Sequence, residues 1–147
     1  MLVINSEIFR KVEKTYHLPV GDLYFFENIA VMQINEGEHA SLKSSQYFLK
    51  KIYDFYETKN KPYGYISNRV NKYSVEVLDY QKQTDLLPNL SIYGIVAYSQ
   101  FDSMNIDIEK QFCKMPVSSF NDLDKAYKYV NNYIVNKSNI IDSLIKK

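Results

Sequence analysis

The first quarter of the chain carries short apolar runs separated by polar turns. The runs occupy residues 9–18, 23–26 and 29–34, and a polar Glu-Asn pair separates the last two. Runs that alternate with period two and are joined by two-residue polar turns are typical of antiparallel strands. We therefore predict an antiparallel meander that ends at Gly37.

A helix, a strand and a second helix are expected next. Ser41 is a favourable N-cap residue, and apolar residues recur at helical spacing from there to Tyr56. A strand is expected over residues 63–68. Ser74 can cap the second helix, which would run to Leu87 before a Pro-Asn pair ends it.

Two further strands are expected in the second half. Residues 90–98 are nearly all apolar, which is typical of a central strand that is covered on both faces. Ile95 and Val96 should therefore lie in the core. Residues 116–120 begin with proline, and a leading proline is tolerated in an edge strand.

Two helices complete the pattern. A short one fits residues 103–113, with three apolar residues in line on the face expected to be buried. These are Met104, Ile108 and Phe112. Asn121 and Asp124 resemble a capping box, and the cleanest amphipathic stripe in the sequence follows them. Residues 138–147 are expected to add a last helical turn.

The order β-β-β-α-β-α-β-α-β-α predicts an α/β (α+β mixed sheet) fold. We expect about five to six strands, with an antiparallel meander at the N-terminus and about four helices mainly on one face. We find no linker or repeat, so residues 1–147 are expected to form a single domain. Its core should span residues 9–134, and residues 135–147 should form a helical tail.

Composition fits a folded domain with no affinity for polyanions. Of the 147 residues, 46% are apolar and 24% are charged, close to the average for globular proteins. The formal net charge is only +1, so we expect no nucleic-acid partner. The chain has fourteen Tyr, eight Phe and no Trp, and tyrosine suits half-buried positions because its ring packs while its hydroxyl stays wet.

The sequence also bears on the compartment. Cys113 is the single cysteine, so no internal disulfide can form. The first residues lack the pattern of a signal peptide, and no apolar run approaches the ~18–20 residues of a membrane helix. We therefore expect a cytoplasmic protein without membrane insertion.

Three segments resemble the STAS-like family, a group of small bacterial proteins related in fold to sporulation anti-sigma-factor antagonists. The segments are GDLYFFENIAVMQINEG, PYGYISNRVNKYSV and MPVSSFNDLDKAYKYV. The resemblance covers roughly residues 9–134 and implies the STAS-like fold. It also implies a non-enzymatic switch module that binds a partner protein. The similar fold of lipid-carrying SEC14-type domains implies an alternative, a carrier of a small apolar ligand.

The resemblance places the switch of this family at Ser74. The family's switch is a serine at the start of the helix after the middle strand, within an Asp-Ser-Ser-Gly-like turn. Ser74 holds that position, but neither the glycine nor the adjacent aspartate is present. Ser74 is thus a possible phosphosite.

The loop that follows the middle strand is the first candidate site, because α/β sheets bind ligands at the carboxyl ends of their strands. A helix N-terminus attracts anions, and Arg69 would add a forked donor. The alternative is structural: Ser74 caps the helix and Arg69 pairs with Glu36 or Glu38. The partner-binding residues predicted here are Asn68, Arg69, Asn71, Tyr73 and Ser74.

Three other features favour a structural reading, and a fourth leaves both readings open. Glu36, Glu38 and His39 could bind metal or exchange protons, but with two histidines in the chain an exposed turn is favoured. Cys113 is expected to be buried and unreactive. Residues 61–68 superficially copy an RNA-recognition octamer, but the helix directly before them does not fit that module. The excess of tyrosines on the first and last helices indicates that some are exposed, either at a protein interface or as ordinary surface residues.

These observations favour a non-enzymatic STAS-like regulatory or protein-interaction module. Its partner would be another protein, and a homodimer is possible. We expect no catalytic residues, no metal and no cofactor, because no paired base, nucleophile and oxyanion donor can be assembled from the residues present.

Overall fold

A computed structural model describes residues 1–99 and 101–145 of the chain. It contains a six-stranded mixed sheet with the order β1-β2-β3-β5-β7-β8. The strands are β1 (Lys14–Leu18), β2 (Gly21–Phe25), β3 (Ile29–Ile34), β5 (Tyr63–Arg69), β7 (Leu90–Ala97) and β8 (Val117–Phe120). Strands β1, β2 and β3 pair antiparallel, and from β3 onwards every pair is parallel. The predicted α/β class and N-terminal meander are confirmed.

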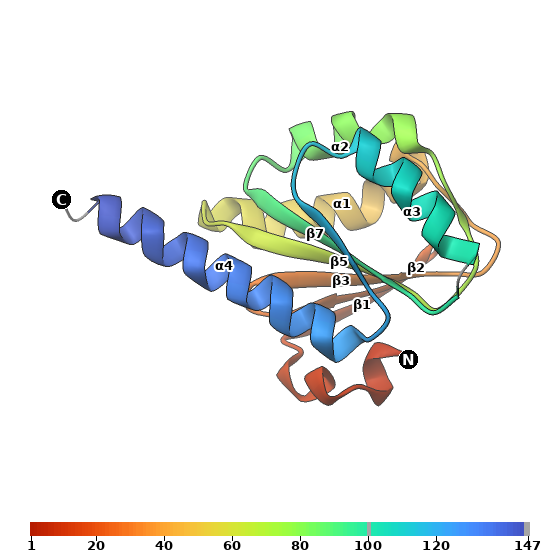
Figure 1. Cartoon of the computed structure of the whole chain (residues 1–147), viewed down its shortest axis with the longest axis horizontal. Helices are drawn as coiled ribbons and strands as arrows, with labels where there is room; N and C mark the ends of the chain where they lie inside the picture. The colour runs from red at the N-terminus through yellow and green to blue at the C-terminus, as the bar shows by residue number, and fades with distance from the viewer. Residues whose placement is uncertain (100, 146–147) are drawn as a thin grey trace.

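Helices cover both faces of this sheet (Figure 1). Helices α1 (Leu42–Tyr56), α2 (Tyr80–Leu86) and α3 (Phe101–Phe112) lie on one face, and α4 (Leu123–Ile145) crosses the other. Two 3-10 turns, Val3–Asn5 and Glu7–Lys11, lie beside the start of α4. Three of the four described helices thus share a face. Further 3-10 turns span Glu57–Lys59 and Val77–Asp79, and a separate two-stranded sheet pairs β4 (His39–Ala40) with β6 (Ser74–Val75).

The alternation of side chains along β3 explains why this strand is buried throughout. Ile29 and Val31 belong to the hydrophobic core under α4. Ala30, Met32 and Ile34 belong to the core under α1. Since successive side chains of a strand point to opposite faces, one apolar run supplies two cores.

Helix α1 begins where the sequence predicts. The Ser41 hydroxyl accepts a hydrogen bond from the backbone N–H of Ser44 at 3.2 Å, and the Ser44 hydroxyl accepts one from the N–H of Ser41 at 2.9 Å. This reciprocal pair satisfies two of the donors that a helix start leaves open. Downstream of the helix, Asn60 adopts a left-handed conformation with φ 51°.

Several other predicted elements are confirmed. The strands expected at residues 63–68 and 90–98 are β5 and β7, and Ile95 and Val96 are fully buried. The strand expected at 116–120 is β8, at the edge of the sheet.

Both ends of the chain differ in detail from the prediction. The strand expected over residues 9–18 starts only at Lys14, because residues 7–11 form a 3-10 turn that buries Ile8. The last helix is capped by Asp122 rather than Asn121: its carboxylate accepts from the N–H of Lys125 at 3.1 Å. The helix then continues unbroken to residue 145, and residues 146–147 of the expected last turn lie outside the described residues.

The face that α3 buries differs from the predicted one. Ile108 and Phe112 are 47% and 40% exposed, whereas Ile106 and Glu109 face inward. The side chain of Met104 lies outside the described part. The apolar spacing pointed to the wrong face because a buried carboxylate, Glu109, takes a position that hydrophobic periodicity cannot recognise.

Across residues 1–99 and 101–145, no helix combines the length and the apolar character needed to span a bilayer.

Candidate functional site under and over the β4–β6 pair

Two loops meet at the carboxyl ends of β3 and β5. One carries β4 and the other carries β6, and the two strands pair in parallel. The N–H of Ser74 donates to the carbonyl of Glu38 at 3.0 Å, and that of Glu76 donates to Ala40 at 2.8 Å. We call β4 and β6 together the roof, because they cover a space between α1 and the sheet.

Ser74 is therefore not a helix cap, and the prediction of a helix over residues 74–87 is wrong at its start. Helix α2 begins only at Tyr80. The ladder with β4 holds Ser74 and Val75 extended, and the carboxylate of Glu76 caps the following 3-10 turn by accepting from the N–H of Leu78 at 3.4 Å.

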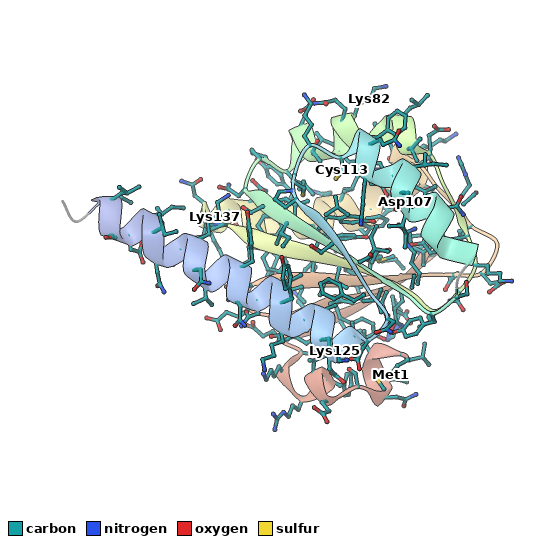
Figure 2. The ribbon with its side chains drawn as sticks, viewed as in Figure 1. Met1, Lys82, Asp107, Cys113, Lys125 and Lys137 are labelled. Atoms are coloured by element: carbon teal, nitrogen blue, oxygen red, sulfur yellow. The ribbon has the colours of Figure 1, made fainter. Side chains whose placement is uncertain are left out.

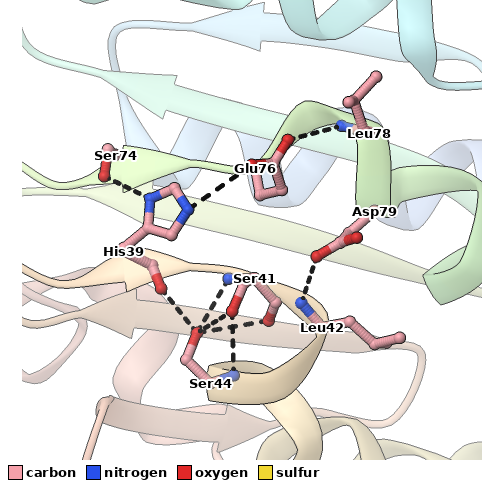
Figure 3. Close-up of polar contacts among 8 residues, drawn as sticks. All are labelled: His39, Ser41, Leu42, Ser44, Ser74, Glu76, Leu78 and Asp79. Carbon is pink, nitrogen blue, oxygen red and sulfur yellow. Dashed lines mark hydrogen bonds and ion pairs between the residues drawn. The ribbon is translucent and has the colours of Figure 1, made fainter.

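The outer face of the roof carries a serine, a histidine and a carboxylate (Figure 3). Nδ1 of His39 lies 2.7 Å from the Ser74 hydroxyl, and Nε2 lies 3.9 Å from a carboxylate oxygen of Glu76. Ser74 is exposed, and the His39 and Glu76 side chains are 54% and 40% exposed.

A serine hydroxyl that is hydrogen-bonded to an imidazole can act as a nucleophile when a carboxylate orients the other side of the imidazole ring. Catalysis of that kind also needs N–H donors aimed at a developing oxyanion. The backbone N–H of Ser74 already donates to the carbonyl of Glu38, and that of Glu76 donates to the carbonyl of Ala40, so neither N–H is free to bind an oxyanion.

The roof is tied to the start of α1 (Figure 3). The Asp79 carboxylate accepts from the N–H of Leu42 at 2.7 Å, and the Ser44 hydroxyl donates to the carbonyl of His39 at 2.7 Å. A carboxylate at a helix N-terminus is also favoured by the helix dipole. These bonds fix the position of the roof over the sheet.

A cavity of about 60 Å³ lies beneath the roof. The roof contributes Ala40 and Val75 to its wall, and α1 contributes Phe48, Leu49 and Ile52. Most of the wall is thus apolar.

Arg69, which lines the cavity, belongs to a buried ion pair. Arg69 at the end of β5 is 8% exposed, and Glu109 on α3 is 2% exposed. The guanidinium donates from Nη1 and Nη2 to the two carboxylate oxygens, each at 2.5 Å. Nε of Arg69 donates to the Ser67 hydroxyl at 3.2 Å, and Nη2 also donates to the Tyr93 hydroxyl at 3.2 Å.

Tyrosines surround this ion pair. The Tyr80 hydroxyl donates to Glu109, and the ring of Tyr93 stacks on that of Tyr65 with centroids 5.4 Å apart. The Arg69 guanidinium carbon lies 5.6 Å from the centroid of the Tyr73 ring. Burial raises the pKa of Tyr93 to about 12 and also raises the pKa of Tyr80 and Tyr65, because the charged phenolate would be desolvated.

The five residues predicted to bind a partner are divided by the structure between interior and surface. Asn68 is buried, and its Nδ2 donates to Gln33 Oε1 and to the Met1 carbonyl, each at 2.9 Å. Nδ2 of Asn71 donates to the Ile34 carbonyl at 3.1 Å. Arg69 and Tyr73 line the cavity, and Ser74 alone among the five is exposed.

The structural alternative for Arg69 named the wrong partner. Arg69 pairs with Glu109, whereas Glu36 accepts from the N–H of Lys72 at 3.2 Å. Arg69 is the seventh residue of β5, and its side chain points to the face covered by α3 rather than toward the loop after β3.

The remaining candidates lie as follows. In the described part of the chain, no three His, Cys, Asp or Glu residues gather in a way that could hold a metal ion. Cys113, after the end of α3 (Figure 2), is half-buried at the cavity wall, and burial raises its pKa. In the octamer, Tyr63 is fully buried and stacks on Tyr56 of α1, so its ring is covered.

Sequence reasoning missed Glu109, Tyr80 and Tyr93. Glu109 lies three positions after Ile106 on the same helix face, but this placement marks it only once the burial of Ile106 is known from the structure. The two tyrosines read as ordinary apolar residues, and nothing in the pattern distinguished their hydroxyls as partners of a buried charge.

No protein-family model, no curated protein and no solved structure matches this chain. Its class therefore rests on the geometry: a mixed α/β sheet with a hydrogen-bonded strand pair over a small cavity at the carboxyl ends of β3 and β5.

Proposed function

We propose that this chain is a non-enzymatic regulatory module of the STAS-like type, which binds another protein through the outer face of the roof. One observation carries the proposal: the exposed Ser74 hydroxyl is held 2.7 Å from His39 on a ladder fixed by backbone hydrogen bonds. Polar groups that are ordered before binding lose less entropy on association. This surface is supported from the inner side by Asn68, Arg69, Asn71 and Tyr73.

Ser74 also fits the role of a switch. A phosphate there would add about −1.5 to −2 charges beside His39 and Glu76. Protonated His39 would attract it, and the Glu76 carboxylate, 3.9 Å from the His39 ring nitrogen, would repel it. Phosphorylation would thus change the charge of the outer face and the geometry of the β4–β6 ladder.

The carrier alternative is less well supported by the two hollows next to α1. The cavity beneath the roof, at about 60 Å³, is far below the ~300 Å³ at which pockets for drug-sized ligands begin. A larger groove of about 690 Å³ between α1 and α2 is open and lined in part by the exposed charged residues Lys43, Lys50 and Asp54, which do not suit an apolar ligand. A bound lipid, found by native mass spectrometry of the purified protein, would reverse this preference.

The experiment compares proteins captured by the wild type, Ser74→Asp and Ser119→Asp. Ser119 is the matched control, since it is also an exposed serine in a short strand but lies in β8, away from the roof. Each variant must first melt within a few degrees of the wild type. We expect the set of proteins captured by Ser74→Asp to differ by at least one specific partner from the set captured by the wild type. The set captured by Ser119→Asp should be the same as that of the wild type. Identical captured sets in all three would refute the proposal.

A further inference from the structure

We propose that the cavity beneath the roof is a binding site for a small uncharged molecule that carries one hydroxyl or carbonyl group. This goes beyond the proposed function, because it concerns the inner rather than the outer face of the roof. Three properties of the cavity define the ligand: its volume, its charge balance and one hydroxyl group with bonding capacity left.

Volume sets the size of the ligand. The cavity measures about 60 Å³. One water-sized position needs roughly 10–15 Å³, so about four to six such positions fit. The ligand is therefore a short-chain molecule, such as a small alcohol, ketone or amide.

Charge balance sets its neutrality. The only guanidinium on the described wall, that of Arg69, is bound through two hydrogen bonds to Glu109. Its third nitrogen donates to Ser67. An anionic ligand would be desolvated here without an unpaired counter-charge, and that cost disfavours its binding. The Glu76 carboxylate also lines the cavity, but it is 40% exposed and lies 3.9 Å from Nε2 of His39, so it is not a buried counter-charge for a cation.

Tyr73 determines which polar group the ligand carries. Tyr73 lines the cavity, and its hydroxyl is 2.8 Å from the Ser67 hydroxyl. A phenolic oxygen can both donate and accept, so one bond leaves capacity for a second. Apolar groups of Phe48, Leu49 and Ile52 line another side of the same space. The ligand's hydroxyl or carbonyl would meet Tyr73 while its alkyl part meets α1.

The ligand would also touch the back of the roof. Ala40 and Val75 line the cavity, while their strand neighbours His39 and Ser74 occupy the outer face. Side chains added at Ala40 or Val75 therefore grow into the space that a ligand would fill. This gives variants that block the cavity and leave the outer residues in place.

The test uses isobutanol as the probe, with isobutyrate as a charged molecule of similar shape. Amide chemical shifts of the whole chain are followed by NMR in a titration. We expect saturable shifts around the roof with isobutanol and none with isobutyrate at neutral pH. Tyr73→Phe should weaken isobutanol binding about three- to tenfold, the value of one hydrogen bond.

Cavity-filling variants decide the location. Ala40→Val should weaken binding at least about tenfold, since the added methyl groups occupy the space. Ala97→Val makes the same change at a half-buried strand position that does not line the cavity, and should change binding less than about twofold. If Ala40→Val does not fold, Val75→Ile, which adds one methyl group, replaces it.

Three results would overturn the assignment: no saturable shift with isobutanol, equal binding of isobutyrate, or equal effects of the Ala40 and Ala97 variants. A cavity that holds only exchanging water gives the first of these. The readout is binding to the purified chain, so it succeeds or fails independently of partner capture through Ser74.

Discussion

Replacing Glu109 by glutamine should be among the most damaging single changes of a charged residue in this protein. The substitution keeps the shape of the side chain and removes only its charge. Arg69 would then remain 8% exposed with no carboxylate opposite its guanidinium. Burying an ion is tolerated only when a partner and hydrogen bonds compensate for the water it loses.

The expected loss is about 3–5 kcal/mol of unfolding free energy, the usual cost of removing one partner of a buried pair. The double variant Arg69→Met with Glu109→Gln should recover part of this loss, because no unpaired charge remains and the amide oxygen of the new glutamine would still offer Tyr80 an acceptor. Removing both charges is often neutral or even stabilising. The two substitutions should therefore not be additive.

Chemical denaturation of the wild type, both single variants and the double variant measures the coupling. Asp54→Asn is the matched control, because Asp54 forms an exposed pair with Lys50 at 3.4 Å within α1. Such surface pairs contribute about 0.5 kcal/mol or less. If Glu109→Gln cost no more than Asp54→Asn, the ion pair would not be buried.

Two further predictions concern packing and pH. Gly64→Ala should destabilise the protein by about 1–3 kcal/mol in thermal or denaturant melts, because a Cβ there would collide with Val130 of α4. Adding Val130→Ala to this variant should restore much of the lost stability. No recovery in the double variant would contradict this packing. Stability should fall as the pH rises above about 10, since unfolded tyrosines ionise there while Tyr93 keeps its proton up to a pKa of about 12. A tyrosinate absorbance titration that showed all fourteen tyrosines ionising together near pH 10 in the folded protein would contradict the burial of Tyr93.

Elements whose signals are local could be predicted from the sequence. Helix α1 carries its own cap at Ser41 and its own apolar stripe, and the structure starts it at the next residue. The run at residues 90–98 is apolar on both faces of a strand and becomes β7. In both cases the physical cause lies within a few residues of the effect.

Features that depend on distant pairing could not be predicted. Ser74 reads as a helix cap, yet β4, 35 residues earlier, draws it into a ladder. Glu109 has the appearance of a solvated charge on α3 in the sequence. Its burial is possible because Arg69, 40 residues earlier, pairs with its carboxylate. Local propensity decides only where no tertiary partner competes for the same backbone or side chain.

The same distant pairing is what gives the candidate site its two faces. Had residues 74–87 formed one helix, Ser74 would have capped it and no strand would have covered the cavity. As a strand pair, the roof points alternate side chains to opposite sides. His39 and Ser74 therefore face solvent while Ala40 and Val75 face the cavity, only one residue away along each strand. A molecule that displaced Ala40 or Val75 would also move the backbone that positions His39 and Ser74, so we expect occupancy of the cavity to alter any recognition at the outer face through this two-residue ladder.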